Sequence, residues 1–231
     1  MFIKHLHKTT LIDYPGQIAS TLFVGGCNFR CCFCYNNDLV YNHENIPTIS
    51  DTDILDFLKN RIGLIDGVVI TGGEPTCQQG LMEFLKELRS FDLKIKIDTN
   101  GYNYEVLKEI IGNQLADYIA MDLKAPLENY KEVTGVDLDT NLVEKSINLL
   151  KNQDSIISEF RTTVWKGYFD KYDPKKLLAP IKGASLYYIH NFFSLVKELP
   201  SSYLPASKEE VAGVLSLANK DIKEVKLRGD W

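Results

Sequence analysis

The sequence has no excess of positive charge, no long apolar run and few cysteines. Its 26 Lys and Arg residues against 31 Asp and Glu give a net charge of −5, which argues against a broad nucleic-acid-binding surface. No apolar stretch approaches the roughly 20 residues that a membrane-spanning helix needs. The first ten residues also lack the continuous apolar segment of a secretory signal. We therefore expect a cytoplasmic protein with neither a membrane nor a nucleic-acid partner.

The chain also lacks Gly/Ser-rich or Pro-rich linkers, low-complexity segments and internal repeats. Hydrophobic residues make up 45% of it and charged residues 25%, as in ordinary globular enzymes. At 231 residues, one fold can bury roughly 70–75% of the surface of the unfolded chain without disulfide or metal support. The sequence therefore predicts a single domain over residues 1–231.

Short apolar segments alternate with amphipathic segments along the chain. The apolar segments predict six strands and a short seventh one, at 19–24, 67–70, 94–99, 118–122, 159–164, 186–190 and 224–227. Apolar residues at helical spacing predict helices at 51–61, 80–89, 104–111 and 141–152, and a last one after Ser207, with Glu210 completing a capping box. This alternation predicts an α/β fold with a parallel sheet covered by helices.

Four polar motifs each follow one of the first four predicted strands. They are the cysteine cluster, Gly72-Gly73-Glu74-Pro75, Asp98-Thr99-Asn100-Gly101 and Asp122-Leu123-Lys124. The carboxyl ends of parallel strands meet at one edge of a sheet, where active sites of such folds lie. We therefore expect the four motifs to form one site.

The five cysteines are clustered and odd in number, unlike a secreted disulfide framework: Cys27, Cys31, Cys32, Cys34 and Cys77. The C-x3-C-x2-C spacing of Cys27, Cys31 and Cys34 suits a [4Fe–4S] cluster with three protein ligands and one open iron. The alternative is a structural zinc site that also uses Cys32. Because adjacent cysteines point to different sides, a four-cysteine tetrahedron is awkward, and Cys32 is interpreted as a non-ligand. Cys77 is interpreted as a small buried cysteine near the site.

The cysteine motif, with Phe33 before its last cysteine, and the Gly72-Gly73-Glu74-Pro75 motif resemble the radical S-adenosylmethionine (SAM) superfamily. The resemblance implies a partial (β/α)6 barrel of parallel strands with helices outside. It also implies that the open iron binds SAM and that cluster reduction cleaves SAM to methionine and a 5′-deoxyadenosyl radical.

A narrower resemblance is carried by Thr10-Leu11-Ile12-Asp13-Tyr14-Pro15-Gly16, by the Gly25–Cys31 stretch and by the closing Lys226-Leu227-Arg228-Gly229. These segments are similar to those of the anaerobic ribonucleoside-triphosphate reductase activating proteins, which are glycyl-radical activases related to the pyruvate formate-lyase activating enzyme. The resemblance implies a glycyl-radical enzyme as partner and a flavodoxin- or ferredoxin-type reductant. Asp13 would border the incoming glycine loop, although Tyr14 replaces a glycine of the related activase.

The resemblance also implies roles for single residues at the SAM site. Glu74 would bind the SAM amino group, with Gly72 and Gly73 allowing close backbone approach, and Lys124 would contact the SAM carboxylate. Further expected contacts of the cofactor are Phe33, Tyr35, Asp98, Asn100, Arg161 and His190. Asp98, Thr99 and Asp122 would form a Na⁺ or K⁺ site. Tyr35 departs from a histidine common at this position, and His5, His7 and His43 are interpreted as surface residues.

Two other functions compete with a reductase activase. The first is enzymatic with the same cofactor and fold: an activase of another glycyl-radical enzyme, or a small-molecule enzyme similar to 7-carboxy-7-deazaguanine synthase. The second is an iron–sulfur electron carrier or a zinc-stapled binding protein without turnover. The Gly72-Gly73-Glu74 motif argues against the second, because an electron carrier needs no ligand for the SAM amino group.

Overall fold

The structure is a computed structural model that describes residues 1–193 and 203–231. Its strands form one sheet in sequential order: β1 (Ile3–Thr10), β2 (Ala19–Val24), β3 (Gly67–Gly72), β4 (Lys94–Thr99), β5 (Tyr118–Asp122), β6 (Ile157–Val164), β7 (Leu186–Asn191) and β8 (Glu224–Arg228). β1 and β2 pair antiparallel, and each later pair of these strands is parallel. The sheet is open, because within the described ranges β1 and β8 form its two edges.

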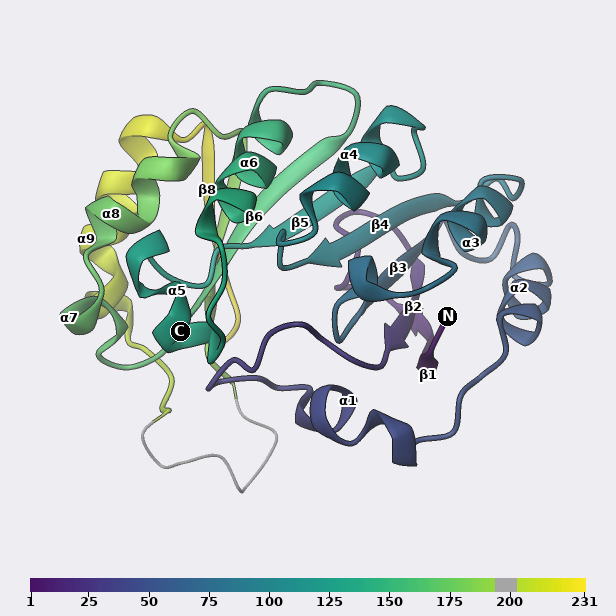
Figure 1. The fold of residues 1–231 in the computed structure, drawn as a ribbon. Coiled ribbons are helices and arrows are strands. Elements are labelled where there is room, and N and C mark those ends of the chain that lie inside the picture. Colours follow the sequence, from purple (N-terminus) through teal and green to yellow (C-terminus); the bar gives the residue numbers. More distant parts are fainter. Residues whose placement is uncertain (194–202) are drawn as a thin grey trace.

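Helices connect the parallel strands. They are α1 (Asn37–Tyr41), α2 (Asp51–Lys59), α3 (Leu81–Leu88), α4 (Tyr104–Gly112), α5 (Tyr130–Thr134), α6 (Thr140–Lys151), α7 (Tyr168–Lys171), α8 (Pro174–Leu178) and α9 (Lys208–Asp221). Short 3-10 turns cover His43–Asn45, Pro75–Cys77, Leu127–Asn129 and Ala179–Ile181. In Figure 1, α3, α4 and α6 lie along one face of the sheet, and the loop after β2 crosses the molecule to reach α1. Among the described helices, none is both long and apolar enough to cross a membrane.

The two faces of the sheet differ in chemistry, because side chains alternate between them along each strand. The outer face carries the apolar residues that pack in the main core, such as Ile70, Ile97 and Ile119. The inner face carries a small separate apolar cluster around Tyr14 and Tyr118. The inner positions of β4 and β6 are charged residues: Lys96, Asp98, Glu159 and Arg161. The helices therefore cover an apolar face and leave a polar one for the site.

The predicted parallel α/β sheet with outer helices is confirmed, and the ends of the predicted strands and longer helices agree with the structure to within two residues. The prediction missed β1, which pairs with β2 and exposes His5 and His7, so it shows little apolar alternation. It also missed the short helices α1, α5, α7 and α8. The interpretation of His43 as a surface residue is wrong, since its side chain is half-buried and packs against Gly25. If Gly25 had a side chain, its Cβ would lie only 2.7 Å from the Cβ of His43.

Candidate active site

The carboxyl ends of β3 to β7 and the cysteine loop enclose a cavity of about 220 Å³. The predicted site residues line this cavity, with the single exception of Asp13. Prediction from sequence missed five further lining residues: Phe29, Asn36, Val40, Thr71 and Thr163. Asn36 and Phe29 lie inside or next to the cysteine motif, while Thr71 and Thr163 sit near the ends of β3 and β6. Position at a strand end is the signal that could have identified the two threonines.

The cysteine loop is held by segments that are distant in the sequence. The Arg30 amide donates to the Thr134 carbonyl at 2.7 Å, and the Cys32 amide donates to the Val133 carbonyl at 3.3 Å. The Asn100 side chain donates to Asn28 Oδ1 at 2.7 Å. Helix α5 and the turn after β4 therefore fix the course of the loop from both sides.

The three motif cysteines face the cavity and differ from the other two. Cys27, Cys31 and Cys34 are half-buried and line the cavity, whereas Cys32 and Cys77 are exposed. Burial raises the pKa of the Cys27 thiol to about 12, with the Glu74 carboxylate adding to the effect, and burial raises the pKa of Cys31 to about 11. These thiols need a bound cation to ionise at neutral pH. The interpretation of Cys77 as buried is wrong: it is exposed and accepts a hydrogen bond from Asn103 at 3.4 Å.

The donor set fits an iron–sulfur cube better than a single metal ion. In the part of the chain that the structure describes, no three His, Cys, Asp or Glu side chains converge as ligands of one ion. A [4Fe–4S] cube does not need such convergence, because each thiolate binds a different iron. The exposed Cys32 does not line the cavity, which disfavours the alternative of a four-cysteine zinc site.

Two glycine pairs bring the cysteine loop and the loop after β3 into backbone contact. The Glu74 amide donates to the Gly26 carbonyl and the Gly73 amide to the Val24 carbonyl, both at 2.8 Å. A Cβ on Gly73 would lie 1.9 Å from the Gly26 oxygen. Gly72 also has a φ of +112°, a conformation that side chains disfavour. Only residues without a Cβ allow this close crossing.

Glu74 is almost fully buried, at 1% exposure, and its carboxylate is hydrogen-bonded within the protein. Its Oε1 accepts from the Thr76 amide at 3.1 Å and from the hydroxyls of Thr76 and Thr99 at 2.6 and 2.7 Å. Its Oε2 accepts from the Asn100 amide at 2.7 Å, which leaves acceptor capacity on that atom. Burial raises the pKa of Glu74, although the four hydrogen bonds favour the charged form. Glu74 therefore joins the loop after β3 to the loop after β4.

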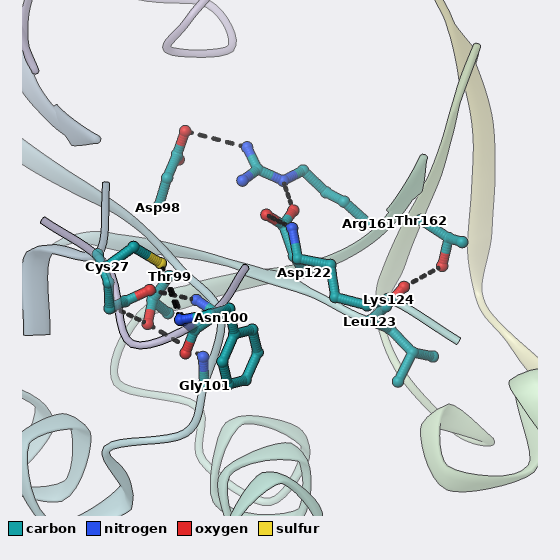
Figure 2. Close-up of polar contacts among 12 residues, drawn as sticks. Cys27, Asp98, Thr99, Asn100, Gly101, Asp122, Leu123, Lys124, Arg161 and Thr162 are labelled. Carbon is teal, nitrogen blue, oxygen red and sulfur yellow. Dashed lines mark hydrogen bonds and ion pairs between the residues drawn. The ribbon is translucent and has the colours of Figure 1, made fainter. Parts of the chain in front are cut away.

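Arg161 connects two aspartates on the inner face, as Figure 2 shows. Its Nε lies 2.7 Å from Asp122 on the neighbouring strand, and its Nη1 lies 3.1 Å from Asp98, one strand further away. Lys124 pairs with Asp122 at 2.9 Å, and Lys96 pairs with Asp98. Burial alone would raise the pKa values of both aspartates, but Arg161 and the lysines lower them below the ordinary value. Both aspartates are therefore ionised and neutralised by the chain itself.

The residues of the predicted Na⁺ or K⁺ site take part in contacts within the chain. Asp98 and Asp122 pair with Arg161, Lys96 and Lys124. The Thr99 hydroxyl donates to Glu74 Oε1 at 2.7 Å. The monovalent cation stays a prediction of the family resemblance.

The remaining predicted residues complete the cavity wall. Phe33 is buried against Trp165, with ring centroids 5.1 Å apart, and the Lys124 ammonium lies 5.7 Å from the Phe33 ring centre. Tyr35 stacks on Phe192 and accepts a hydrogen bond from the Phe193 amide at 2.8 Å. Asp13 lies outside the cavity and accepts a hydrogen bond from Thr21 at 2.6 Å.

His190 contributes a buried ring nitrogen, Nε2, that has no hydrogen-bond partner in the described structure. Burial and the nearby Arg161 and Arg228 lower the pKa of His190 to about 3. The ring is therefore neutral at neutral pH, and the hydrogen-bonding capacity of Nε2 is unused in the described structure.

Comparisons with known proteins place this chain in a family. The family model for the Radical SAM superfamily matches residues 21–173. The provisionally named glycyl-radical enzyme activating enzyme MJ1227 of Methanocaldococcus jannaschii is 33% identical, over 94% of this chain and 91% of its own length. The pyruvate formate-lyase-activating enzyme of Clostridium pasteurianum is 30% identical over 58% of this chain and 57% of its own length.

A solved structure supports the fold. The crystal structure of Streptococcus suis SuiB bound to S-adenosylmethionine superposes with a TM-score of 0.65 at 16% identity, covering 90% of this chain and 52% of SuiB. The chain therefore belongs to the radical SAM superfamily, which implies SAM and a [4Fe–4S] cluster as cofactors, and it is homologous to the glycyl-radical enzyme activating enzymes.

Proposed function

We propose that this protein is a cytoplasmic activase that forms a glycyl radical on an anaerobic ribonucleoside-triphosphate reductase. The observation that carries the proposal is the match along nearly the whole chain to a relative named as a glycyl-radical enzyme activating enzyme. Cys27, Cys31 and Cys34 would hold the cluster, and a flavodoxin- or ferredoxin-type protein would supply the electron. The Thr10–Gly16 and Lys226–Gly229 segments favour the reductase over other glycyl-radical enzymes as partner.

The chemistry needs one electron and one hydrogen atom. Cys27, Cys31 and Cys34 would hold a [4Fe–4S] cluster, which would supply the electron for cleavage of SAM at its S–C5′ bond to methionine and a 5′-deoxyadenosyl radical. The Cα hydrogen of the partner's glycine would pass to that radical, which would leave 5′-deoxyadenosine and the glycyl radical.

The chain's own residues would bind and orient SAM. Glu74 Oε2 has acceptor capacity for the SAM amino group, and Gly72 and Gly73 keep the loop free of side chains there. Lys124 lines the cavity with its charge next to Asp122 and would orient the SAM carboxylate. The neutral ring of His190 would accept a hydrogen bond at Nε2. Asp13, 2.6 Å from the Thr21 hydroxyl, would border the glycine loop on the inner face.

The activity is tested with anaerobically reconstituted protein, dithionite and SAM. We expect release of 5′-deoxyadenosine and methionine by the wild type and by the Cys32→Ala variant, and none by Cys31→Ala. Addition of the anaerobic reductase from the same genome should produce a glycyl-radical doublet in electron paramagnetic resonance. SAM cleavage without that doublet would overturn the reductase as the substrate and favour a small molecule or another partner. Absence of SAM cleavage would overturn every enzymatic interpretation.

A further inference from the structure

Arg228 lies on the inner face of the edge strand β8, beside the cavity but outside its lining. The sheet register places it opposite His190, which lines the cavity on β7. Its side chain is 31% exposed. A molecule that reaches the cavity across the β8 edge of the sheet would therefore pass Arg228.

Two neighbours orient the Arg228 guanidinium. Its central carbon lies 4.0 Å from the ring centre of Tyr188, which is close enough for stacking. Its Nη1 lies 3.9 Å from Oε1 of Glu159, a fully buried side chain whose other oxygen accepts from Tyr118. Since 3.9 Å is too long for a hydrogen bond, Glu159 holds the guanidinium by charge without using its N–H groups.

The other inner-face cations have closer carboxylate partners. Arg161 and Lys124 contact Asp122 at 2.7 and 2.9 Å, and Lys96 pairs with Asp98. Lys226, two residues before Arg228 on the same strand, lies 5.9 Å from the Tyr188 ring centre but pairs with Glu224 at 2.7 Å. Among the described residues, no hydrogen bond uses the Arg228 guanidinium. Tyr188 and Glu159 therefore orient a guanidinium whose N–H donors are unused.

We propose that Arg228 is a substrate-binding residue that binds a main-chain carbonyl of the substrate's glycine loop. This inference rests on the proposed activase function. A planar guanidinium presents several N–H donors in a fixed geometry that suits carbonyl and carboxylate oxygens. An extended loop in the open side of the barrel lacks sheet partners and needs donors for its carbonyls. Tyr188 and Glu159 act as positioning residues for the guanidinium.

The test compares Arg228→Gln with Arg228→Lys and with the matched control Lys226→Gln, all reconstituted as holoenzyme. The measurements are glycyl-radical formation on the reductase as a function of its concentration, and the KM for SAM in the same assay. We expect Arg228→Gln to raise the KM for the reductase about tenfold, from loss of one charge-assisted hydrogen bond, without a matching rise in the KM for SAM. Arg228→Lys should give a smaller increase, and Lys226→Gln a change of less than about twofold.

The outcomes distinguish a failure of the role of Arg228 from a failure of the proposed activase function. If the wild type activates the reductase and Arg228→Gln leaves the KM for the reductase unchanged, the role of Arg228 is overturned, while the activase function still holds. An equal rise in both KM values would assign Arg228 to the cofactor site instead and would also overturn the inference. A wild type that cleaves SAM but never activates the reductase would overturn the proposed function and this inference with it. Arg228→Lys keeps the charge at this position, so it answers the question if Arg228→Gln does not fold.

Discussion

The two walls of the cavity are built by different means. The wall formed by the cysteine loop and the loop after β3 depends on backbone contacts between Gly73 and the Val24–Gly26 segment. The opposite wall, on the inner face of β4 to β6, depends on ion pairs of side chains that come from three strands. We call them the glycine wall and the charged wall. The glycine wall tolerates almost no added side-chain volume, whereas the charged wall is sensitive to the loss of a charge.

The largest effect is expected at the glycine wall, from Gly73→Ala. A Cβ there would lie 1.9 Å from the Gly26 oxygen, so two backbones must separate. We expect a loss of stability of more than about 4 kcal/mol and loss of most of the cluster on reconstitution. Urea unfolding of the apoprotein and iron analysis after reconstitution measure the two effects.

Gly112→Ala is the matched control for this substitution. Its Cβ meets nothing within 4 Å, and the residue ends helix α4. It should leave stability and iron content as in the wild type. Wild-type stability and iron content in Gly73→Ala would contradict the close crossing of the two loops.

The charged wall should respond to Arg161→Gln, which keeps the polarity but removes the cation. Asp98 and Asp122 would then lose their shared partner in a largely buried position. Each aspartate would keep its lysine, Lys96 or Lys124, but the guanidinium between the two buried carboxylates would be lost, and we expect a cost of about 3 kcal/mol. Urea unfolding measures it, with Arg161→Lys retaining part of the stability.

Lys131→Gln provides the comparison at the surface. Lys131 pairs with Asp137 at 2.7 Å, but the two side chains are 71% and 80% exposed. Its loss should cost less than about 1 kcal/mol. Equal costs for the two substitutions would mean that the inner-face ion pairs contribute no more than surface ones.

The sequence predicts the glycine wall better than the charged wall, for a physical reason. Cys27–Cys34 and Gly72–Pro75 are contiguous motifs, so their residues carry the signal locally. Arg161 was expected near the site, but its link to Asp98 runs across β5 and depends on the register of three strands. No local pattern encodes that register.

Parts of the glycine wall were also beyond prediction. Helix α5 is only five residues long, yet its end at Thr134 accepts a hydrogen bond from Arg30 in the cysteine loop. A helix this short has too few turns to show an apolar period. The antiparallel strand β1 was missed because His5 and His7 interrupt its apolar pattern on the exposed side.

A smaller effect is expected from Glu74→Gln, which lies where the two walls meet. The side chain would keep one oxygen but place an NH₂ group opposite a hydroxyl or amide that now donates to the carboxylate. We expect a loss of about 2 kcal/mol of stability, from one unsatisfied buried donor, and weaker SAM binding. Unfolding of the apoprotein and isothermal titration with SAM measure these effects. Glu83→Gln, on the exposed side of α3, should change neither quantity.

The smallest effect concerns His190, on β7 beside the charged wall, and is a dependence on pH. The pKa of His190 is lowered to about 3 in the folded protein, from the ordinary value of about 6.5 expected after unfolding. The unfolded chain therefore binds a proton in this range that the folded one does not. This group's contribution to stability is complete above pH 6.5 and is lost as the pH falls toward 3.

Between pH 7 and pH 5.5, this linkage should lower the free energy of unfolding by about 1 kcal/mol. His190→Asn removes the titrating ring, so the difference between wild type and variant should shrink by that amount over the same interval. Urea unfolding of both apoproteins at the two pH values isolates the contribution of His190, because the two proteins share the same carboxylates. An identical pH dependence in the two proteins would mean that His190 titrates normally. The charged wall would then admit a protonated histidine beside Arg161 and Arg228.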